Sequence, residues 1–323
     1  MLESIKCNFC NKDQAKLLFK VKENITCFHE EFCVVKCKNC GLVYTNPRPG
    51  KRDISKYYPS DSYYSYKKNN VKTLKERIRN IYLEEVGRYP GNGKENFLAK
   101  WLKKFIVTFV KGNISVIVPY IDKGKILDIG CGRGSLLQWL KNHKWETYGV
   151  EINKHAAEDG NREELNIFNG ELTDANYLSD FFDIVVINQV LEHVYDPQET
   201  LREIYRILKP TGLLIVGVPN IDSYEAKIFQ KYWFALQIPT HLYHFSADSL
   251  KLMLLENKFK IKKIINKVFI PLYNKYSLSL LIMEKKYLRA FYSCVMIFLK
   301  PFLLFFSKEK NKFGQNITIY AEK

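Results

Sequence analysis

Residues 125–137, KILDIGCGRGSLL, decide the fold, because a short apolar strand there runs directly into a group of glycines. Gly130, Gly132 and Gly134 form a loop whose backbone a ligand can approach closely. A dinucleotide fingerprint needs glycine where this chain has Ser135, and the Gly-Lys-Ser/Thr triplet of a phosphate-binding loop does not follow. The loop therefore predicts a small ligand that is held near the backbone but not through either phosphate motif.

Acidic residues near this loop indicate the charge of the ligand. Asp128 lies two residues before the first glycine, where its carboxylate would repel a pyrophosphate and attract an ammonium group. Glu151 ends the next strand, about twenty residues later, where an acid accepts hydrogen bonds from a ribose diol. Glu171 follows the third strand and is expected near an adenine edge. These positions predict a positively charged nucleoside, and S-adenosylmethionine fits that description.

The chain around the loop alternates strand-like and helix-like segments, which is the pattern of a doubly wound, mostly parallel α/β sheet. Strands are expected at 125–130, 146–152, 166–170, 182–190, 212–219 and 259–265. A helix is expected from Pro197, with Asp196 as its cap and Glu199 completing a capping box, and it stops before Pro210. Such sheets bind their ligands at the carboxyl ends of the strands.

Residues 116–265 resemble a class I S-adenosylmethionine-dependent methyltransferase. The stretches that carry the resemblance are LDIGCGRGSLL, GVEIN, FDIVVINQVLEHVYDP and LKPTGLLIVGVPN, in the order and spacing of that family. The resemblance implies a seven-stranded sheet whose last strand is antiparallel, and NITIYAEK at 316–323 would supply that strand. It also implies S-adenosylmethionine as the cofactor. The residues implied to line the cofactor site are Asp128, Gly130, Cys131, Gly132, Gly134, Glu151, Ile152, Glu171 and Asn188.

The first forty residues hold two C-x-x-C pairs, which supply enough thiolates for one tetrahedral Zn²⁺ site. The expected ligands are Cys7, Cys10, Cys37 and Cys40. A site closed by four cysteines has no open position, so its role would be structural. The gap between the pairs is long, and it holds three residues that could replace a ligand: Cys27, His29 and Cys33.

The cysteine-rich head, residues 1–50, narrows the resemblance to one group of methyltransferases. CKNCGLVYTNPRP, followed by YYPSDSYYSY, is similar to the zinc-headed methyltransferases of bacterial sugar and cell-surface glycan pathways, which include deoxysugar C-methyltransferases. The implied acceptor is a sugar nucleotide or a lipid-linked glycan of polysaccharide biosynthesis. The alternative is a tRNA or rRNA methyltransferase, because zinc ribbons often bind nucleic acid and the formal charge of this chain is +16.

Candidates for the acceptor side follow two strands. Glu192 and His193 come just after the fourth strand, and His193 is either a base, a substrate-orienting group or a packed side chain. His241 matches a histidine that approaches the acceptor in the related glycan enzymes, and His244 lies three residues later. In the C-methyltransferases the residue before this histidine tends to be glutamate, whereas here it is Thr240. O- and N-methylation of a sugar therefore stay open beside C-methylation.

Aromatic and basic residues around positions 48–68 are further candidates for the acceptor site. Tyrosines suit sugar faces, although they can equally pack the zinc module onto the rest of the chain. The tyrosines concerned are Tyr57, Tyr58, Tyr63, Tyr64 and Tyr66. Cationic side chains nearby suit a nucleotide-sugar diphosphate, and they are Arg48, Lys67 and Lys68.

The whole chain of 323 residues is expected to have four parts. They are a zinc-binding module at 1–50, a basic, tyrosine-rich helical connector at 51–115, the methyltransferase core at 116–265, and an apolar helical insertion with the last strand at 266–323.

Eight cysteines and an N-terminus without an apolar signal segment indicate a reduced, cytoplasmic chain. Residues 291–307 are apolar but interrupted by Lys300 and Pro301, so we expect an interfacial helix at the inner membrane face, core burial or a homodimer contact.

Overall fold

A computed structural model describes residues 1–23, 30–58, 85–90, 116–267 and 314–323, together with positions 81, 103, 277, 282, 287, 291, 294 and 295. Contacts divide the chain into two compact units. Unit 1 comprises residues 1–61, 189–201 and 218–319, and unit 2 comprises residues 62–188, 202–217 and 320–323. The four consecutive parts expected from the sequence stay a prediction, and the two units are described separately below.

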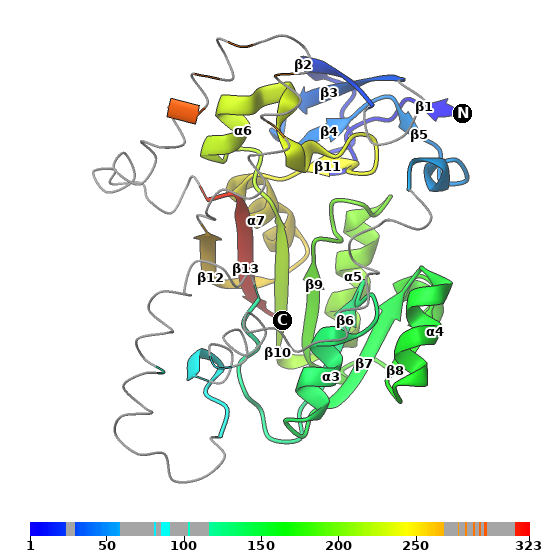
Figure 1. The fold of residues 1–323 in the computed structure, drawn as a ribbon, viewed down its shortest axis with the longest axis vertical. Helices are drawn as coiled ribbons and strands as arrows, with labels where there is room; N and C mark the ends of the chain where they lie inside the picture. The colour runs from blue at the N-terminus through cyan, green and yellow to red at the C-terminus, as the bar shows by residue number, and fades with distance from the viewer. Residues whose placement is uncertain are drawn as a thin grey trace. The chain divides into compact units, whose positions relative to one another are not determined.

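The main sheet has seven strands in the order β12-β13-β10-β9-β6-β7-β8 (Figure 1). The strands are β6 (Lys125–Ile129), β7 (Glu146–Glu151), β8 (Asn166–Asn169), β9 (Phe182–Asn188), β10 (Leu208–Pro219), β12 (Lys260–Lys267) and β13 (Asn316–Glu322). All pairs from β8 across to β10 are parallel. β13 is antiparallel to β10, because the Lys323 N–H donates to the Gly212 carbonyl and the Asn220 N–H donates to the Gln315 carbonyl. The predicted fold class is therefore confirmed.

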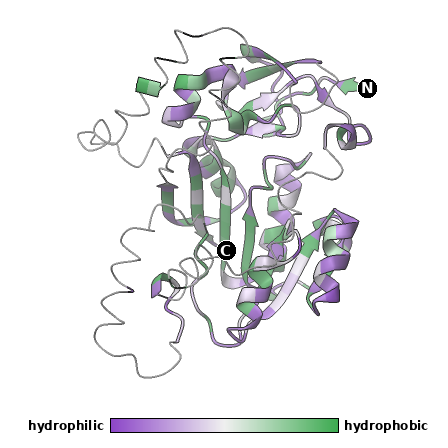
Figure 2. Cartoon of the chain, in the orientation of Figure 1, coloured by the Kyte–Doolittle hydropathy of each residue, from purple (hydrophilic) through white to green (hydrophobic). Residues whose placement is uncertain are grey.

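The central strands form because their sequences are continuous apolar runs, as expected for parallel strands that are covered on both faces. Residues 184–187 of β9 read IVVI, and all four side chains are fully buried. Figure 2 shows the same hydrophobic character along β9 and β10.

One predicted strand boundary is wrong. Strand β10 begins at Leu208, four residues before the expected start at Gly212. Leu208 already pairs with Phe182, and an irregularity in the register follows before Leu213. Thr211 has a φ of 63° inside this irregularity, so the Lys-Pro-Thr-Gly stretch that reads as a loop is a bulge within the strand.

Helices α3 (Ser135–Lys141), α4 (Lys154–Arg162) and α5 (Pro197–Ile207) follow strands β6, β7 and β9 along the chain. The predicted start of α5 is confirmed, because Asp196 Oδ1 accepts hydrogen bonds from the N–H groups of Gln198 and Glu199, both at 3.0 Å. The helix also ends before Pro210, as expected from the missing N–H of proline.

Unit 1 contains a four-stranded sheet in the order β11-β4-β3-β2 and a two-stranded sheet of β1 and β5. These strands are β1 (Leu2–Glu3), β2 (Ala15–Lys22), β3 (Glu31–Cys37), β4 (Val43–Thr45), β5 (Arg48–Pro49) and β11 (Tyr243–His244). Its other elements are η1 (Ile54–Tyr57), α6 (Tyr224–Phe229), η4 (Gln230–Tyr232), η5 (Phe234–Leu236) and α7 (Ala247–Glu256). The cysteine-rich head and the chain after β10 therefore build one sheet, since Tyr243 pairs with Tyr44 and His244 with Val43.

A shared hydrophobic core holds these segments of unit 1 together. Phe32 and Val34 of the cysteine-rich head pack with Phe229 and Trp233 from the segment after β10, and Tyr57 belongs to the same cluster. The packing interpretation of Tyr57 is thus supported. Burial of this apolar surface is worth about 25 cal/mol per Å², so the two segments stabilise each other.

Parts of the expected connector and insertion lie outside the described residues. These include Tyr63, Tyr64, Tyr66, Lys67 and Lys68, and most of 291–307. Within the described residues, the structure contains no helix with the length and apolar character needed to cross a membrane.

Candidate active site

The glycine loop between β6 and α3 adopts a backbone that only glycine accommodates easily. Gly130, Gly132 and Gly134 have φ values of 69°, 57° and 79°. A Cβ at Gly134 would also lie 2.4 Å from Leu165 Cδ1. Three residues with positive φ within five positions curl the backbone tightly before Ser135 starts the helix.

Glu151 fixes the position of this loop. Its Oε2 accepts a hydrogen bond from the Gly132 N–H at 2.9 Å, and its Oε1 accepts one from the Asn153 N–H at 2.8 Å. Burial raises the pKa of Glu151, while these backbone hydrogen bonds oppose the rise. Each oxygen keeps a second lone pair, so Glu151 can accept the expected hydrogen bonds from a ribose diol as well as those from the loop.

Asp128 lies at the carboxyl end of β6 and is only 8% exposed. Among the residues that the structure describes, none donates a hydrogen bond to its carboxylate. Burial, together with the nearby charge of Glu151, raises the pKa of Asp128 to about 7. A buried acid without a partner is costly unless a cation compensates its charge. The site therefore fits the ammonium group of S-adenosylmethionine, whose sulfonium supplies a methyl group for transfer when the cofactor is bound.

We expect the affinity for S-adenosylmethionine to fall as the pH is lowered through about 7, where Asp128 takes up a proton. The sign follows because only the ionised carboxylate attracts the ammonium group, and a bound cation favours ionisation. Calorimetric titrations with S-adenosylhomocysteine, which keeps the amino group, would measure the slope. A flat affinity across this range in the native protein would contradict the assignment of Asp128.

The other predicted cofactor residues differ in their surroundings. Ile152 is 70% exposed and Glu171 is exposed, so both side chains are accessible to a ligand. Cys131 packs against the small core of α3 and α4, and burial raises the pKa of its thiol. A structural role for the Cys131 side chain is consistent with this packing.

Asn188 ends β9, and its Oδ1 is buried without a hydrogen-bond partner in the described structure. A Cβ at Gly217 on the neighbouring strand β10 would lie 2.3 Å from this oxygen. Gly217 therefore leaves the space that the Asn188 amide occupies. The sequence analysis missed Gly217, although a glycine in a strand commonly marks a close approach of another group.

In unit 1, Glu192, His193 and His241 come together, and we call them the histidine–glutamate cluster. One possible ligand atom from each residue lies within 4.8 Å of the others. The rings of His193 and His241 meet edge to face, with centroids 4.5 Å apart and an interplanar angle of 84°. The sequence predicted each of these residues separately, and the structure places them in one site.

Backbone carbonyl groups orient both imidazole rings. His193 Nδ1 lies 2.9 Å from the Thr240 carbonyl oxygen, and His241 Nδ1 lies 2.9 Å from the Ala235 carbonyl oxygen. A carbonyl oxygen only accepts hydrogen bonds, so Nδ1 carries the proton in each ring. The Tyr58 hydroxyl also lies 3.0 Å from His193 Nδ1, which places this predicted acceptor-site tyrosine beside the cluster.

Burial dominates the electrostatics of this cluster. It lowers the pKa of His193 to about 4 and that of His241 well below its usual value. It raises the pKa of Glu192 to about 8. His244 is also buried, with its pKa lowered to about 3, and its Nε2 lies 3.4 Å from Thr45 Oγ1 on β4. The imidazoles are therefore neutral at physiological pH.

Main-chain hydrogen bonds hold the two parts of the cluster together. The Glu192 carbonyl accepts from the N–H groups of Leu242 and Tyr243, at 2.8 and 3.2 Å. The Thr45 hydroxyl donates to the His241 carbonyl at 3.0 Å. The segment after β9 is thereby tied to the segment that carries His241, and both are tied to the cysteine-rich head.

The predicted zinc ligands also meet in unit 1. Cys7, Cys10, Cys37 and Cys40 place their sulfur atoms within 4.8 Å of one another, and Cys7–Cys40 and Cys10–Cys37 are each 3.5 Å apart. This geometry fits a tetrahedral ion bound by thiolates. Cys33 is not part of the cluster, whereas Cys27 and His29 lie outside the described residues.

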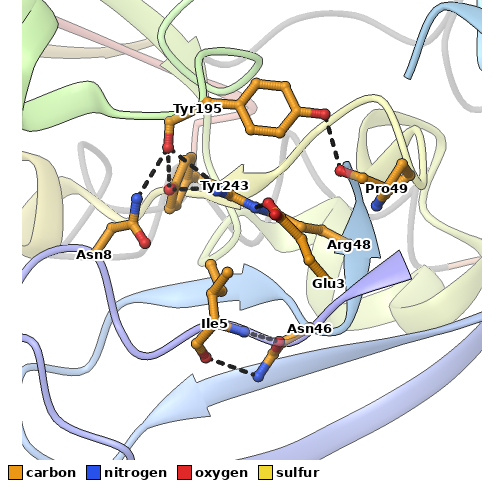
Figure 3. Close-up of polar contacts among 8 residues, drawn as sticks. All are labelled: Glu3, Ile5, Asn8, Asn46, Arg48, Pro49, Tyr195 and Tyr243. Atoms are coloured by element: carbon orange, nitrogen blue, oxygen red, sulfur yellow. Dashed lines mark hydrogen bonds and ion pairs between the residues drawn. The ribbon is translucent and has the colours of Figure 1, made fainter. Parts of the chain in front are cut away.

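Arg48 has a structural environment that differs from the one expected. Its side chain is buried, and it donates to Glu3, to the Tyr195 carbonyl and to the Tyr243 hydroxyl (Figure 3). Its guanidinium also lies over the ring of Tyr195 at 4.6 Å. These contacts engage Nε and Nη1 of a buried side chain, so Arg48 anchors unit 1.

The strand order, the glycine loop and the acids at the ends of β6 and β7 define a class I S-adenosylmethionine-dependent methyltransferase. Residues 97–264, more than half of the chain, match the methyltransferase domain family, and the chain belongs to that family. It therefore contains an S-adenosylmethionine-dependent methyltransferase domain.

Similar proteins give further comparison. An uncharacterized protein of Methanocaldococcus jannaschii is 29% identical over 132 residues, which is 41% of this chain and 62% of that protein. The ubiquinone biosynthesis O-methyltransferase of Coxiella burnetii is 34% identical over 106 residues, which is 30% of this chain and 45% of the relative. The match thus spans less than two thirds of either relative. A solved methyltransferase of Thermotoga maritima, described as a possible histamine N-methyltransferase, has a TM-score of 0.46 and 18% identity, covering 76% of this chain and 99% of that one.

Proposed function

We propose that this enzyme methylates a hydroxyl oxygen of a sugar, in a nucleotide-linked or lipid-linked glycan acceptor. The observation that carries the proposal is the histidine–glutamate cluster, which begins four residues after the end of β9. In α/β sheets ligands bind beyond the carboxyl ends of the strands. Two neutral imidazoles and a carboxyl group there are suited to bind an acceptor hydroxyl and orient its oxygen.

Two features favour oxygen as the methylated atom. The Coxiella burnetii relative is named an O-methyltransferase. Thr240 stands where the related deoxysugar C-methyltransferases tend to carry a glutamate beside the histidine, and its hydroxyl donates to the Gln237 carbonyl at 2.8 Å. Thr240 therefore supplies no carboxylate for removal of a proton from carbon. The glycan class of the acceptor rests on the resemblance of the cysteine-rich head and the tyrosine-rich stretch that follows it.

The proposal includes a structural Zn²⁺ ion on Cys7, Cys10, Cys37 and Cys40. Their sulfur atoms are already gathered, and four thiolates complete the coordination of zinc. Such an ion would stabilise the cysteine-rich head, whose strand β4 pairs with β11 next to His241.

The direct test is to incubate the enzyme with isotopically labelled S-adenosylmethionine and a panel of sugar nucleotides, and to analyse the products by mass spectrometry. We expect one added methyl group, located on oxygen by fragmentation. Bulk tRNA and rRNA serve as competing acceptors. Label in RNA alone, with binding that weakens steeply as salt increases, would replace the sugar proposal by the nucleic-acid alternative.

Replacing His241 by Ala is expected to lower kcat by about 100- to 10,000-fold, the range attributed to groups that assist proton transfer. The affinity for S-adenosylmethionine should stay within about threefold, because in the described structure His241 shares no contact with Glu151, which holds the glycine loop. Steady-state kinetics with separate calorimetry would measure both quantities. The exposed His155 on α4 provides a matched control, His155→Asn, which should keep full turnover. Full turnover in His241→Ala would remove His241 from the acceptor site.

A further inference from the structure

The Glu192 carboxyl group has no compensation among the residues that the structure describes. Its side chain is 1% exposed, and neither carboxyl oxygen has a hydrogen-bond partner. Burying a polar group without hydrogen bonds costs on the order of 1–3 kcal/mol, and more for a charged group. The fold nevertheless holds Glu192 in place through two hydrogen bonds to its own carbonyl. This arrangement points to a group beyond the described residues that satisfies the carboxyl oxygens.

The two histidines beside Glu192 are oriented as metal ligands usually are. Each ring uses Nδ1–H to donate to a backbone carbonyl, of Thr240 for His193 and of Ala235 for His241. A hydrogen bond of this kind fixes the tautomer and the ring orientation of a metal-binding histidine. It leaves the Nε2 lone pair of each ring free to form a bond. In the described part of the chain, no protein group bonds to either Nε2.

From these two observations we infer that the histidine–glutamate cluster binds a divalent first-row transition-metal ion. Two imidazole nitrogens and one carboxylate oxygen suit such ions, whereas Mg²⁺ and Ca²⁺ prefer oxygen ligands throughout. The ligand atoms lie within 4.8 Å of one another. An ion between these atoms would need ligand bonds of ~2.0–2.2 Å.

This site differs in kind from the four-cysteine cluster. Three protein ligands leave coordination positions open, which is typical of catalytic rather than structural sites. If the proposed function holds, an open position would take the acceptor hydroxyl oxygen and the ion would lower the pKa of that hydroxyl. The hydroxyl proton then passes to water, the oxygen forms a bond to the methyl carbon, and the breaking carbon–sulfur bond leaves its electron pair on sulfur. In this arrangement His193 and His241 assist the proton transfer by holding the ion.

The test uses the full-length protein, freed of metal with a chelator and then titrated with Co²⁺. Co²⁺ bound by thiolates shows intense charge-transfer absorption, and Co²⁺ bound by nitrogen and oxygen does not. We expect a Co²⁺ ion of the second type in the native protein. In Glu192→Gln its affinity should fall by more than about 100-fold, the upper range for losing even an outer-shell partner. The matched control His155→Asn should leave it unchanged.

Each outcome decides the inference. A native protein that binds Co²⁺ only through thiolates would overturn it, and so would a Glu192→Gln variant that keeps the nitrogen- and oxygen-bound ion. His241→Asn provides a second ligand variant, and binding of S-adenosylhomocysteine in the same samples reports whether each variant is folded. Metal binding is read without any methyl acceptor. An enzyme that binds the ion but methylates no sugar would therefore refute the proposed function and leave the metal site standing.

Discussion

Replacing Asp128 by Asn is expected to weaken the binding of S-adenosylmethionine by about 100- to 4,000-fold. The loss of one partner from a buried charged pair costs about 3–5 kcal/mol, and each 1.4 kcal/mol corresponds to a factor of ten. In the protein without cofactor, the same substitution should raise the melting temperature by several degrees at pH 8. Asp128 has a folded pKa of about 7, above its usual value of 3.8, so its ionisation opposes folding as the pH rises between these values. Asparagine carries no such charge.

A substitution that weakens cofactor binding but raises the melting temperature identifies an acid that serves binding. Replacing an acid that only stabilises the fold would lower both the affinity and the melting temperature. Calorimetry with the cofactor and a thermal melt without it give the two readings. Asp122→Asn is the control, since Asp122 is exposed and interacts with the Tyr120 hydroxyl at 2.8 Å. Unchanged cofactor affinity in Asp128→Asn would mean that the ammonium group binds elsewhere. The substitution should also abolish the fall in affinity at lower pH.

Replacing Cys37 by Ser is expected to remove the metal ion that the thiolates hold and to destabilise unit 1. Structural zinc contributes about 10–16 kcal/mol of apparent binding free energy in small zinc domains, and that energy supports folding. Methyl transfer should fall by more than about 100-fold because β3 and β4 support β11 and the adjoining His241. The affinity for S-adenosylmethionine should change less than about tenfold, since Glu151 holds the glycine loop within unit 2.

Cys33→Ser is the matched control, because Cys33 lies on the same strand, β3, and outside the cluster. X-ray absorption at the zinc edge detects sulfur neighbours and should report the same zinc–sulfur signal in the native protein and in this control. A loss of zinc–sulfur contacts in Cys33→Ser would assign Cys33 as a ligand. An unchanged zinc–sulfur signal in Cys37→Ser would exclude the proposed set.

The sequence was sufficient to predict those parts of the site whose residues lie close together in the chain or on successive strands. Asp128 and the loop glycines lie within seven residues, and Glu151 follows on the next strand, so their proximity comes from the order of parallel strands alone. The four-cysteine site was also predictable, because a C-x-x-C spacing already brings two thiolates together. The doubly wound sheet followed from the alternation of apolar strands and helical segments, and its seventh, antiparallel strand followed from the family resemblance.

The remainder depended on contacts between distant residues. Glu192 and His241 meet because the Glu192 carbonyl accepts hydrogen bonds from the residues just after His241. The pattern of apolar and polar residues in the sequence does not predict such a hydrogen bond. Strand β11 has only two residues, too few to show an alternating pattern. The charge of Arg48 suggested a ligand for phosphate. The sequence could not show that Arg48 bonds to Glu3 and to the Tyr195 carbonyl, because these partners are distant along the chain.

The pairing of β4 with β11 has a consequence for any shortened version of the protein. Removing the first fifty residues would strip β11 of its neighbour and leave the backbone groups of Tyr243 and His244 without their partners on β4. It would also uncover Phe229 and Trp233, which now pack against Phe32 and Val34. A protein without these residues would therefore expose an unpaired strand edge next to an apolar surface. This combination favours aggregation.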